Sequence, residues 1–156
     1  MTPPNIPLPY RFLFLYFEPL AALGGTLITL TDPSRYLLSL SPTATPLTYS
    51  PLTSPIYDQL SGHLLNFAWG QAVVLRTTSE LKVWKAVLFG MFLCDLLHLW
   101  ASARILGWAV FLNPGLWRWE EWVNFVMLYG PGMMRLGVVM EVGFGDGKRK
   151  GEGKDA

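Results

Sequence analysis

The chain has 156 residues, a length that suits one domain, and 51% of them are apolar whereas 15% are charged. Soluble domains carry about 25% charged residues, so this composition indicates a membrane protein. The formal net charge of +1 gives no basic field that would attract nucleic acid, and the single cysteine excludes an internal disulfide and a cysteine-rich zinc site.

The N-terminal region lacks the features of a cleavable signal. It opens with "MTPPNIPLPYR", which has no lysine-rich start, and the apolar run that follows contains Glu18 and Pro19. We therefore predict a short tail over residues 1–10 and a retained helix over 11–31. Asp32 as N-cap and Pro33 as first residue then predict a short interfacial helix that extends to residue 40.

Three further segments approach the length of about 20 mainly apolar residues that crosses a bilayer. We predict spans over 57–76, 84–106 and 119–142, of which the first and the last are the weaker predictions. The sequence thus predicts an all-α protein, a four-transmembrane-helix bundle over residues 11–142.

The connecting segments differ in composition. Residues 41–55 are rich in Pro, Ser and Thr, which is typical of an extended loop, and residues 143–156 are rich in Gly and Lys, which predicts a disordered tail. The turn at 113–115 breaks the apolar stretch between the third and fourth spans. The tryptophans that follow this turn suit an aromatic belt at the membrane interface: Trp117, Trp119 and Trp122.

Basic residues in the flanks predict the orientation. Eight lysines and arginines flank the spans on the side of both termini, against three on the opposite side. Because cytosolic loops carry the excess of basic residues, we expect both termini in the cytosol. The predicted location is the endoplasmic reticulum or another endomembrane.

Each predicted span carries one stripe of mainly polar residues at the spacing of a single helix face. In 84–106, Asp95 and His98 interrupt an apolar run near the bilayer centre, where exposing an acid to lipid costs about 2.5–3.5 kcal/mol. The stripes should therefore face inward and line a bundle with a polar interior. The other stripe members are Arg11, Glu18, Ala22, Gly25 and Thr29; Gln59, His63, Asn66 and Gly70; Met91 and Ser102; and Glu121, Asn124, Leu128, Pro131 and Arg135.

Depth along the helices, at about 1.5 Å per residue, predicts which polar residues meet. Glu18 and Arg135 have similar depths, about 10 Å from the cytosolic boundary, which predicts a buried ion pair. The pair could simply lock two helices, and we favour that role over a chemical one. Similar matching predicts a central cluster that lines the main cavity: Asp95, His98, His63 and Asn66.

Each member of that cluster also has a purely structural interpretation. Asp95 and His98 could pin a neighbouring helix, and His63 and Asn66 are of types that more often pack between helices than bind ligands. Two histidines and one acid could bind a metal ion, but they lie on separate helices without an HxxxH or HxxE pattern. We predict neither a metal nor a cofactor.

The run "LPYRFLFLYFEPLAALGG" at residues 8–25, followed by "DPSRYL" at 32–37, resembles a family of small fungal integral membrane proteins known as a domain of unknown function, number 7704. The resemblance extends through "NFAWGQAVVLR" and "CDLLHLW" to about residue 142 and carries no established activity. A looser analogy exists to emopamil-binding and sterol-isomerase-like bundles and to membrane terpene cyclases, where only acids in the first and third spans match in kind.

Three functions are compatible with these features. The first is a non-catalytic protein that binds a lipid-like ligand or a protein partner through its polar interior. The second is an acid–base isomerase or cyclase of a sterol- or terpenoid-like substrate, with Asp95 as proton donor, His98 or His63 as acceptor, and Trp69 or Trp100 stabilising a carbocation. The third is a transporter subunit or proton relay, for which four helices are few unless the chain forms a homo-oligomer.

A pocket beside the central acid would favour the enzyme, a water path would favour transport, and a bundle whose polar groups satisfy one another would favour a structural protein. The candidate catalytic residues are Glu18, Asp95 and His98. The candidate ligand-binding residues are His63, Asn66, Trp69, Trp100, Asn124 and Arg135.

Overall fold

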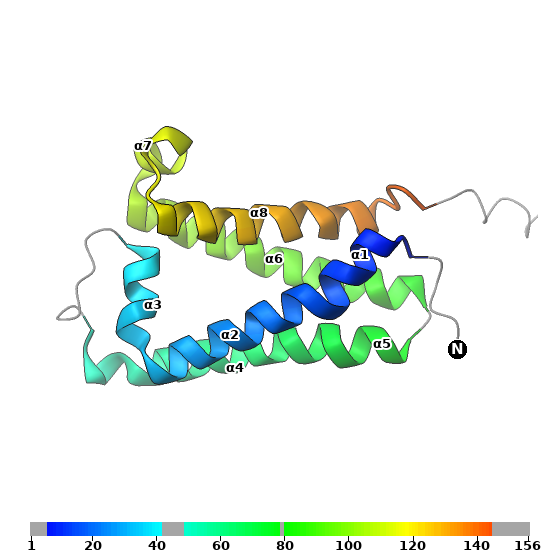
Figure 1. Cartoon of the computed structure of the whole chain (residues 1–156), viewed down its shortest axis with the longest axis horizontal. Coiled ribbons are helices and arrows are strands. Elements are labelled where there is room, and N and C mark those ends of the chain that lie inside the picture. Colours follow the sequence, from blue (N-terminus) through cyan, green and yellow to red (C-terminus); the bar gives the residue numbers. More distant parts are fainter. Residues whose placement is uncertain (1–5, 42–48, 79, 145–156) are drawn as a thin grey trace, which may run out of the picture.

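The computed structural model describes residues 6–41, 49–78 and 80–144, and the regular elements within these ranges are all helical. The predicted all-α class is therefore confirmed. Four long helical stretches run side by side in alternating directions (Figure 1). They coincide with the four predicted segments to within a few residues and form two hairpins.

The first hairpin joins the first two long stretches. Its elements are α1 (Leu8–Phe12), η1 (Leu13–Phe17) and α2 (Glu18–Thr31), followed after a connection by η3 (Pro51–Thr53), α4 (Ser54–Trp69), η4 (Gly70–Val74) and α5 (Leu75–Thr77). Small residues bring α2 and α4 together: the hydroxyls of Thr29 and Ser61 lie 2.6 Å apart. A Cβ added to Gly25 would come within 3.2 Å of Leu64, so glycine permits this close approach.

Pro19 accounts for a widened, π-helical turn in the first stretch. A proline has no N–H, so the carbonyl of Leu15, four residues earlier, loses its ordinary helical donor. The Glu18 N–H donates to the Leu13 carbonyl five residues back, as in a π-helix. The Arg76 guanidinium donates to the Leu15 carbonyl instead and so connects the end of the first hairpin to its beginning.

The second hairpin consists of α6 (Leu81–Leu106) and α8 (Trp119–Val139), with α7 (Trp108–Phe111) and η5 (Pro114–Leu116) between them. α6 ends at Gly107, whose φ of 77° suits glycine. The predicted turn is confirmed, since the Asn113 side chain accepts a hydrogen bond from the Gly115 N–H at 3.2 Å. Phe111 packs edge-on against Phe125, with ring centroids 5.4 Å apart, and so holds α7 on α8.

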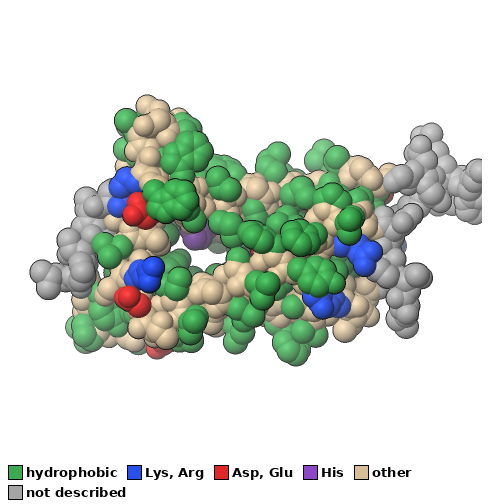
Figure 2. Space-filling model, in the orientation of Figure 1, with side chains coloured by type: hydrophobic (Ala, Val, Ile, Leu, Met, Phe, Trp, Pro, Cys, Tyr) green, Lys and Arg blue, Asp and Glu red, His purple; other side chains and the backbone are tan. Residues whose placement is uncertain are grey.

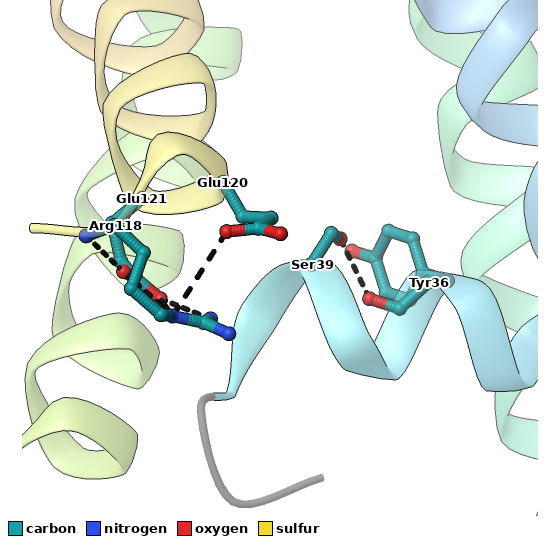
Figure 3. A network of polar contacts seen from close by, with 5 residues as sticks. All are labelled: Tyr36, Ser39, Arg118, Glu120 and Glu121. Atoms are coloured by element: carbon teal, nitrogen blue, oxygen red, sulfur yellow. Dashed lines mark hydrogen bonds and ion pairs between the residues drawn. The ribbon is translucent and has the colours of Figure 1, made fainter. Parts of the chain in front are cut away.

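The predicted short helix is present as α3 (Pro33–Leu40), and Asp32 caps it by accepting from the Arg35 N–H at 3.0 Å. α3 lies across the end of the molecule and packs against α8. Figure 3 shows this junction, where Tyr36 on α3 and Glu120 on α8 project toward the space between the two helices. α3 therefore bridges the two hairpins at the end opposite Ile6 and Phe144, the described ends of the chain.

The predicted boundaries need correction in three places. The predicted loop over 41–55 ends early, because Pro51–Thr53 forms a 3-10 turn and Ser54 begins α4; residues 42–48 lie outside the described part. The predicted N-terminal tail is partly helical, since α1 begins at Leu8 and an apolar environment buries Tyr10. At the other end, Phe144 stacks on Tyr10 with ring centroids 5.8 Å apart; the rest of the predicted tail, 145–156, is not described.

The apolar core lies at the end where the described termini meet. Side chains from all four long stretches contribute to it: Ile6, Tyr10, Phe14, Leu15, Leu75, Trp84, Leu88, Met91 and Val138. In the other half, the buried residues lie at the contacts within each hairpin. They include Thr26, Thr29 and Ser61 in the first hairpin and Ser102, Phe125 and Leu128 in the second.

The two hairpins consequently pack together at one end and diverge toward the other. Figure 2 shows the result as an opening between them, bordered by α3 on its outer side, with histidine (purple) visible at its edge. We call this opening the cleft.

Candidate functional site

A buried ion cluster joins the two hairpins at the closed end of the cleft. Arg135 on α8 donates to Glu18 at the start of α2 and to Asp95 on α6. The Arg135 residue is 1% exposed and Asp95 is 7% exposed. Water therefore contributes little to these groups, and their charges must be balanced by one another.

Neighbouring side chains support the cluster. Gln71, in the π-helical turn η4, donates its side-chain N–H to Glu18. The Arg135 guanidinium lies 6.0 Å from the ring centroid of Phe14 and 5.9 Å from that of Phe67. All four long stretches provide a polar or charged group to a single network, and Phe14 and Phe67 cover it.

Asp95 packs against Gly132 on α8. A Cβ added to Gly132 would lie 3.5 Å from the Asp95 carboxylate, an ordinary van der Waals distance. Gly132 is buried, as is Pro131 beside it. The Gly-Pro-Gly sequence therefore places a small surface opposite the acid on the facing helix.

The predicted Glu18–Arg135 ion pair is confirmed. The predicted contacts of Asp95 were wrong, because Asp95 pairs with Arg135 and not with His63 or Asn66. The physical reason is the packing at this level. α6 packs along α8, so the guanidinium is within reach of Asp95, and the residue of α4 that faces the cluster is the apolar Phe67, whereas Asn66 is exposed.

One wall of the cleft carries His98 and Asn124. His98 lies one helical turn beyond Asp95 on α6, toward α3, and its ring lies beside the Asn124 side chain on α8. Both residues are partly buried. The two helices of this hairpin therefore present a neighbouring imidazole and amide next to the ion cluster.

The opposite wall carries His63 on α4. Its ring packs on Phe67, one turn further along the helix, with centroids 4.6 Å apart. Phe67 faces Arg135 across the hairpins, so His63 lies on the same, cleft-facing side of α4. Unlike Phe67, His63 is exposed, because the hairpins have separated at its level.

The remaining candidates are more peripheral. Asn66 is exposed, Trp69 is 61% exposed and Trp100 is 54% exposed. Trp100 packs edge-on against Trp108 of α7, with centroids 5.8 Å apart. The structure thus brings Glu18, Asp95 and Arg135 together, joins His98 to Asn124, and leaves the two tryptophans on the outer surface.

The sequence analysis missed two buried polar contacts, one inside the cluster and one outside it. Gln71 is fully buried beside Glu18. It is turned by about 100° from Gly70, the last stripe member predicted for its helix, so the spacing of the stripe did not include it. Outside the cluster, Arg76 donates to the Leu15 carbonyl, and Pro19 is the sequence feature that signals this free carbonyl.

The outer surface of the four long stretches is apolar, with many exposed Leu, Val, Phe and Trp side chains (Figure 2). Two helices, Leu8–Thr31 and Leu81–Leu106, are long and apolar enough to cross a membrane. The two belong to different hairpins. Membrane association is therefore weakly indicated by length and composition.

Comparison with known proteins gives one match. A family model described as a domain of unknown function (DUF7704) matches residues 4–145 of the chain. No curated protein and no solved structure matches the chain.

Proposed function

Because the chain belongs to the DUF7704 family, a domain of unknown function, we propose its role from its geometry: it is a four-span integral membrane protein that binds a lipid-like molecule in the cleft between its hairpins. The argument has two steps, the membrane placement and the cleft.

Packing supports four spans. Only the first and third long stretches are apolar enough to be identified by composition. However, α4 packs along α2, and α8 packs along α6. If the two apolar helices span the membrane, the helices packed along them therefore span it as well. The shortest of the four, α8, has 21 residues and extends about 31 Å, which matches the hydrocarbon thickness of about 30 Å.

The charge distribution supports an orientation with both termini on the cytosolic side, because the basic residues are concentrated there. The membrane we propose is an endomembrane such as that of the endoplasmic reticulum. A reporter fused to the C-terminus should be cytosolic. A glycosylation sequon placed within residues 43–52 should be modified, and one placed in the C-terminal tail should not. Glycosylation of the C-terminal tail alone would show that the orientation is the opposite one.

The single observation that carries the binding proposal is the unequal packing of the two halves. One half of the inter-hairpin space is filled by the apolar core and the ion cluster, and the other half is the cleft. In a bilayer, an open space of this kind between helices is filled by lipid or by a ligand. His63, His98 and Asn124 give that occupant polar partners.

The ion cluster favours binding over acid–base catalysis. Arg135 engages both Glu18 and Asp95, so the two acids that could donate protons already serve to hold the hairpins together. A proton donor would need a carboxyl group that faces the substrate. We therefore propose a binding protein, with the acids as structural residues.

The test compares two tryptophan variants of the protein purified in detergent. His63→Trp places an indole in the cleft at an exposed position, so the fold tolerates it. Leu65→Trp, two residues on and turned by about 200°, replaces a side chain that is 50% exposed on the outer surface. Native mass spectrometry should find a co-purified lipid on the wild type and on Leu65→Trp, and little on His63→Trp. Equal retention by both variants would contradict the proposal.

A further inference from the structure

We propose that the occupant of the cleft is a lipid with an uncharged hydroxyl head group, bound head-first against His98, Asn124 and His63. This inference rests on the proposed function and adds the chemistry of the ligand. Three observations support it: the charges of the ion cluster are already engaged, the polar groups lie deep, and they match a hydroxyl in their hydrogen bonding.

The charged groups nearest the inner end of the cleft are engaged with one another. Arg135, the basic member of the cluster, binds both carboxylates through its two terminal nitrogens, and its remaining Nε–H is buried. The guanidinium is therefore not presented to an anionic head group in the cleft. Conversely, Asp95 is buried and Glu18 nearly so, and neither is presented to an ammonium group in the cleft.

The polar groups lie well inside the proposed membrane. His98 is eight residues before the end of α6 at Leu106, and Asn124 is five residues after the start of α8 at Trp119. At 1.5 Å per residue these positions are about 8 to 12 Å from the helix ends. Moving an ionic head group to that depth costs several kcal/mol, whereas a hydroxyl with partners costs far less.

The side chains match a hydroxyl in kind. A hydroxyl donates one hydrogen bond and accepts up to two. A neutral imidazole carries one donor and one acceptor nitrogen, and a side-chain amide carries both donors and an acceptor. His98 and the neighbouring Asn124, together with the exposed His63 on the facing wall, can therefore supply both kinds of partner to a hydroxyl.

The competing placement puts an anionic head group at the outer end of the cleft. Arg35 on α3 is exposed at that end of the molecule and could bind a phosphate or a carboxylate. A lipid held there would lay its acyl chain against His98 and Asn124, which would then have only each other as polar partners. This mismatch makes the head-first placement the better one, and the two placements depend on different residues.

The experiment uses three probes with the same saturated chain, an alcohol, a carboxylic acid and an amine, at a pH of about 8, where the acid is ionised and the amine is protonated. Each is added to the purified delipidated protein, and the thermal midpoint is followed as a function of probe concentration. We expect the alcohol to stabilise the wild type at the lowest concentration. His98→Phe should weaken the alcohol about tenfold, the loss of about one hydrogen bond, and His98→Gln should keep it.

The outcomes separate the ligand chemistry from the proposed function. The acid could instead bind most strongly, and Arg35→Gln but not His98→Phe could abolish that binding. This result would overturn the proposed hydroxyl head group and leave the cleft as the binding site. Strongest binding of the amine would overturn it as well. If no probe stabilises the wild type, and His63→Trp behaves like Leu65→Trp in lipid retention, the proposed function itself falls.

Discussion

Arg135 in the last long helix donates a hydrogen bond to Glu18 in the first, although 117 residues separate them in the chain. With the bond from Arg135 to Asp95, this contact joins two hairpins that also meet through the apolar core at one end and through α3 at the other. The cluster therefore sets where the hairpins stop packing together and the cleft begins.

Removal of Arg135 should strongly destabilise the protein. Arg135→Leu leaves two buried carboxylates without their partner, and losing one member of a buried pair costs about 3–5 kcal/mol. Unfolding in detergent, followed by circular dichroism against denaturant, would measure this loss. Arg104→Leu, at an exposed position on α6, is the control and should change stability by less than about 0.5 kcal/mol.

Replacing the whole cluster by apolar residues should recover much of the lost stability. Buried ion clusters often tolerate complete apolar replacement better than the loss of one member. The triple variant Glu18→Leu, Asp95→Leu and Arg135→Met should therefore be more stable than Arg135→Leu alone. A triple variant as unstable as the single one would show that the carboxylates are not what destabilises Arg135→Leu.

Arg76 and Pro19 should be energetically coupled. Arg76→Met leaves the Leu15 carbonyl without its donor and also removes the guanidinium from the Tyr16 ring, whose centroid it approaches to 4.6 Å; we expect a loss of about 1–3 kcal/mol. Pro19→Ala restores the helical N–H, so the Arg76→Met loss should be smaller in that background. Strict additivity in the double-mutant cycle would exclude the compensation.

Gly137 should be intolerant of alanine, and Gly130 on the same helix should accept it. A Cβ at Gly137 would lie 2.6 Å from the Tyr10 hydroxyl, which donates to the Val142 carbonyl at 2.9 Å. Displacing that ring should cost about 1–3 kcal/mol. Gly130 has nothing within 4 Å of an added Cβ, so Gly130→Ala should be neutral or stabilise by about 0.5–1 kcal/mol. Thermal midpoints of the two variants, measured side by side, would decide.

Tyr36 on α3 should make stability fall at alkaline pH. Burial of the phenol, with a smaller contribution from Tyr57, raises the pKa of Tyr36 to about 12 from 10.0. The folded state then keeps its proton where the unfolded chain releases it, so this stability is complete below pH 10.0 and is lost as the pH rises toward 12. Tyr36→Phe should show a shallower decline over this range. An identical decline in both proteins would mean that the Tyr36 phenol (Figure 3) does not titrate late.

The helices and the Glu18–Arg135 pair could be predicted because both depend on distance along the chain. A helix rises by a fixed amount per residue, so depth can be counted from the sequence. The partners of Asp95 and His63 could not be predicted in this way, because the depth of two residues does not show whether their helices touch at that level. The divergence of the hairpins, which separates His63 from Asp95, arises from packing between residues far apart in the chain.

The divergence of the hairpins also gives the described part of the molecule an uneven outline, narrower at the end with α1 and α5 and broader at the α3 end (Figure 1). In the proposed membrane placement, the two leaflets must therefore make room for different areas of protein. Such a wedge is accommodated with least elastic strain where the leaflet around its broad end is the convex one. The protein should accordingly accumulate at curved regions of its membrane through shape alone, whatever molecule occupies the cleft.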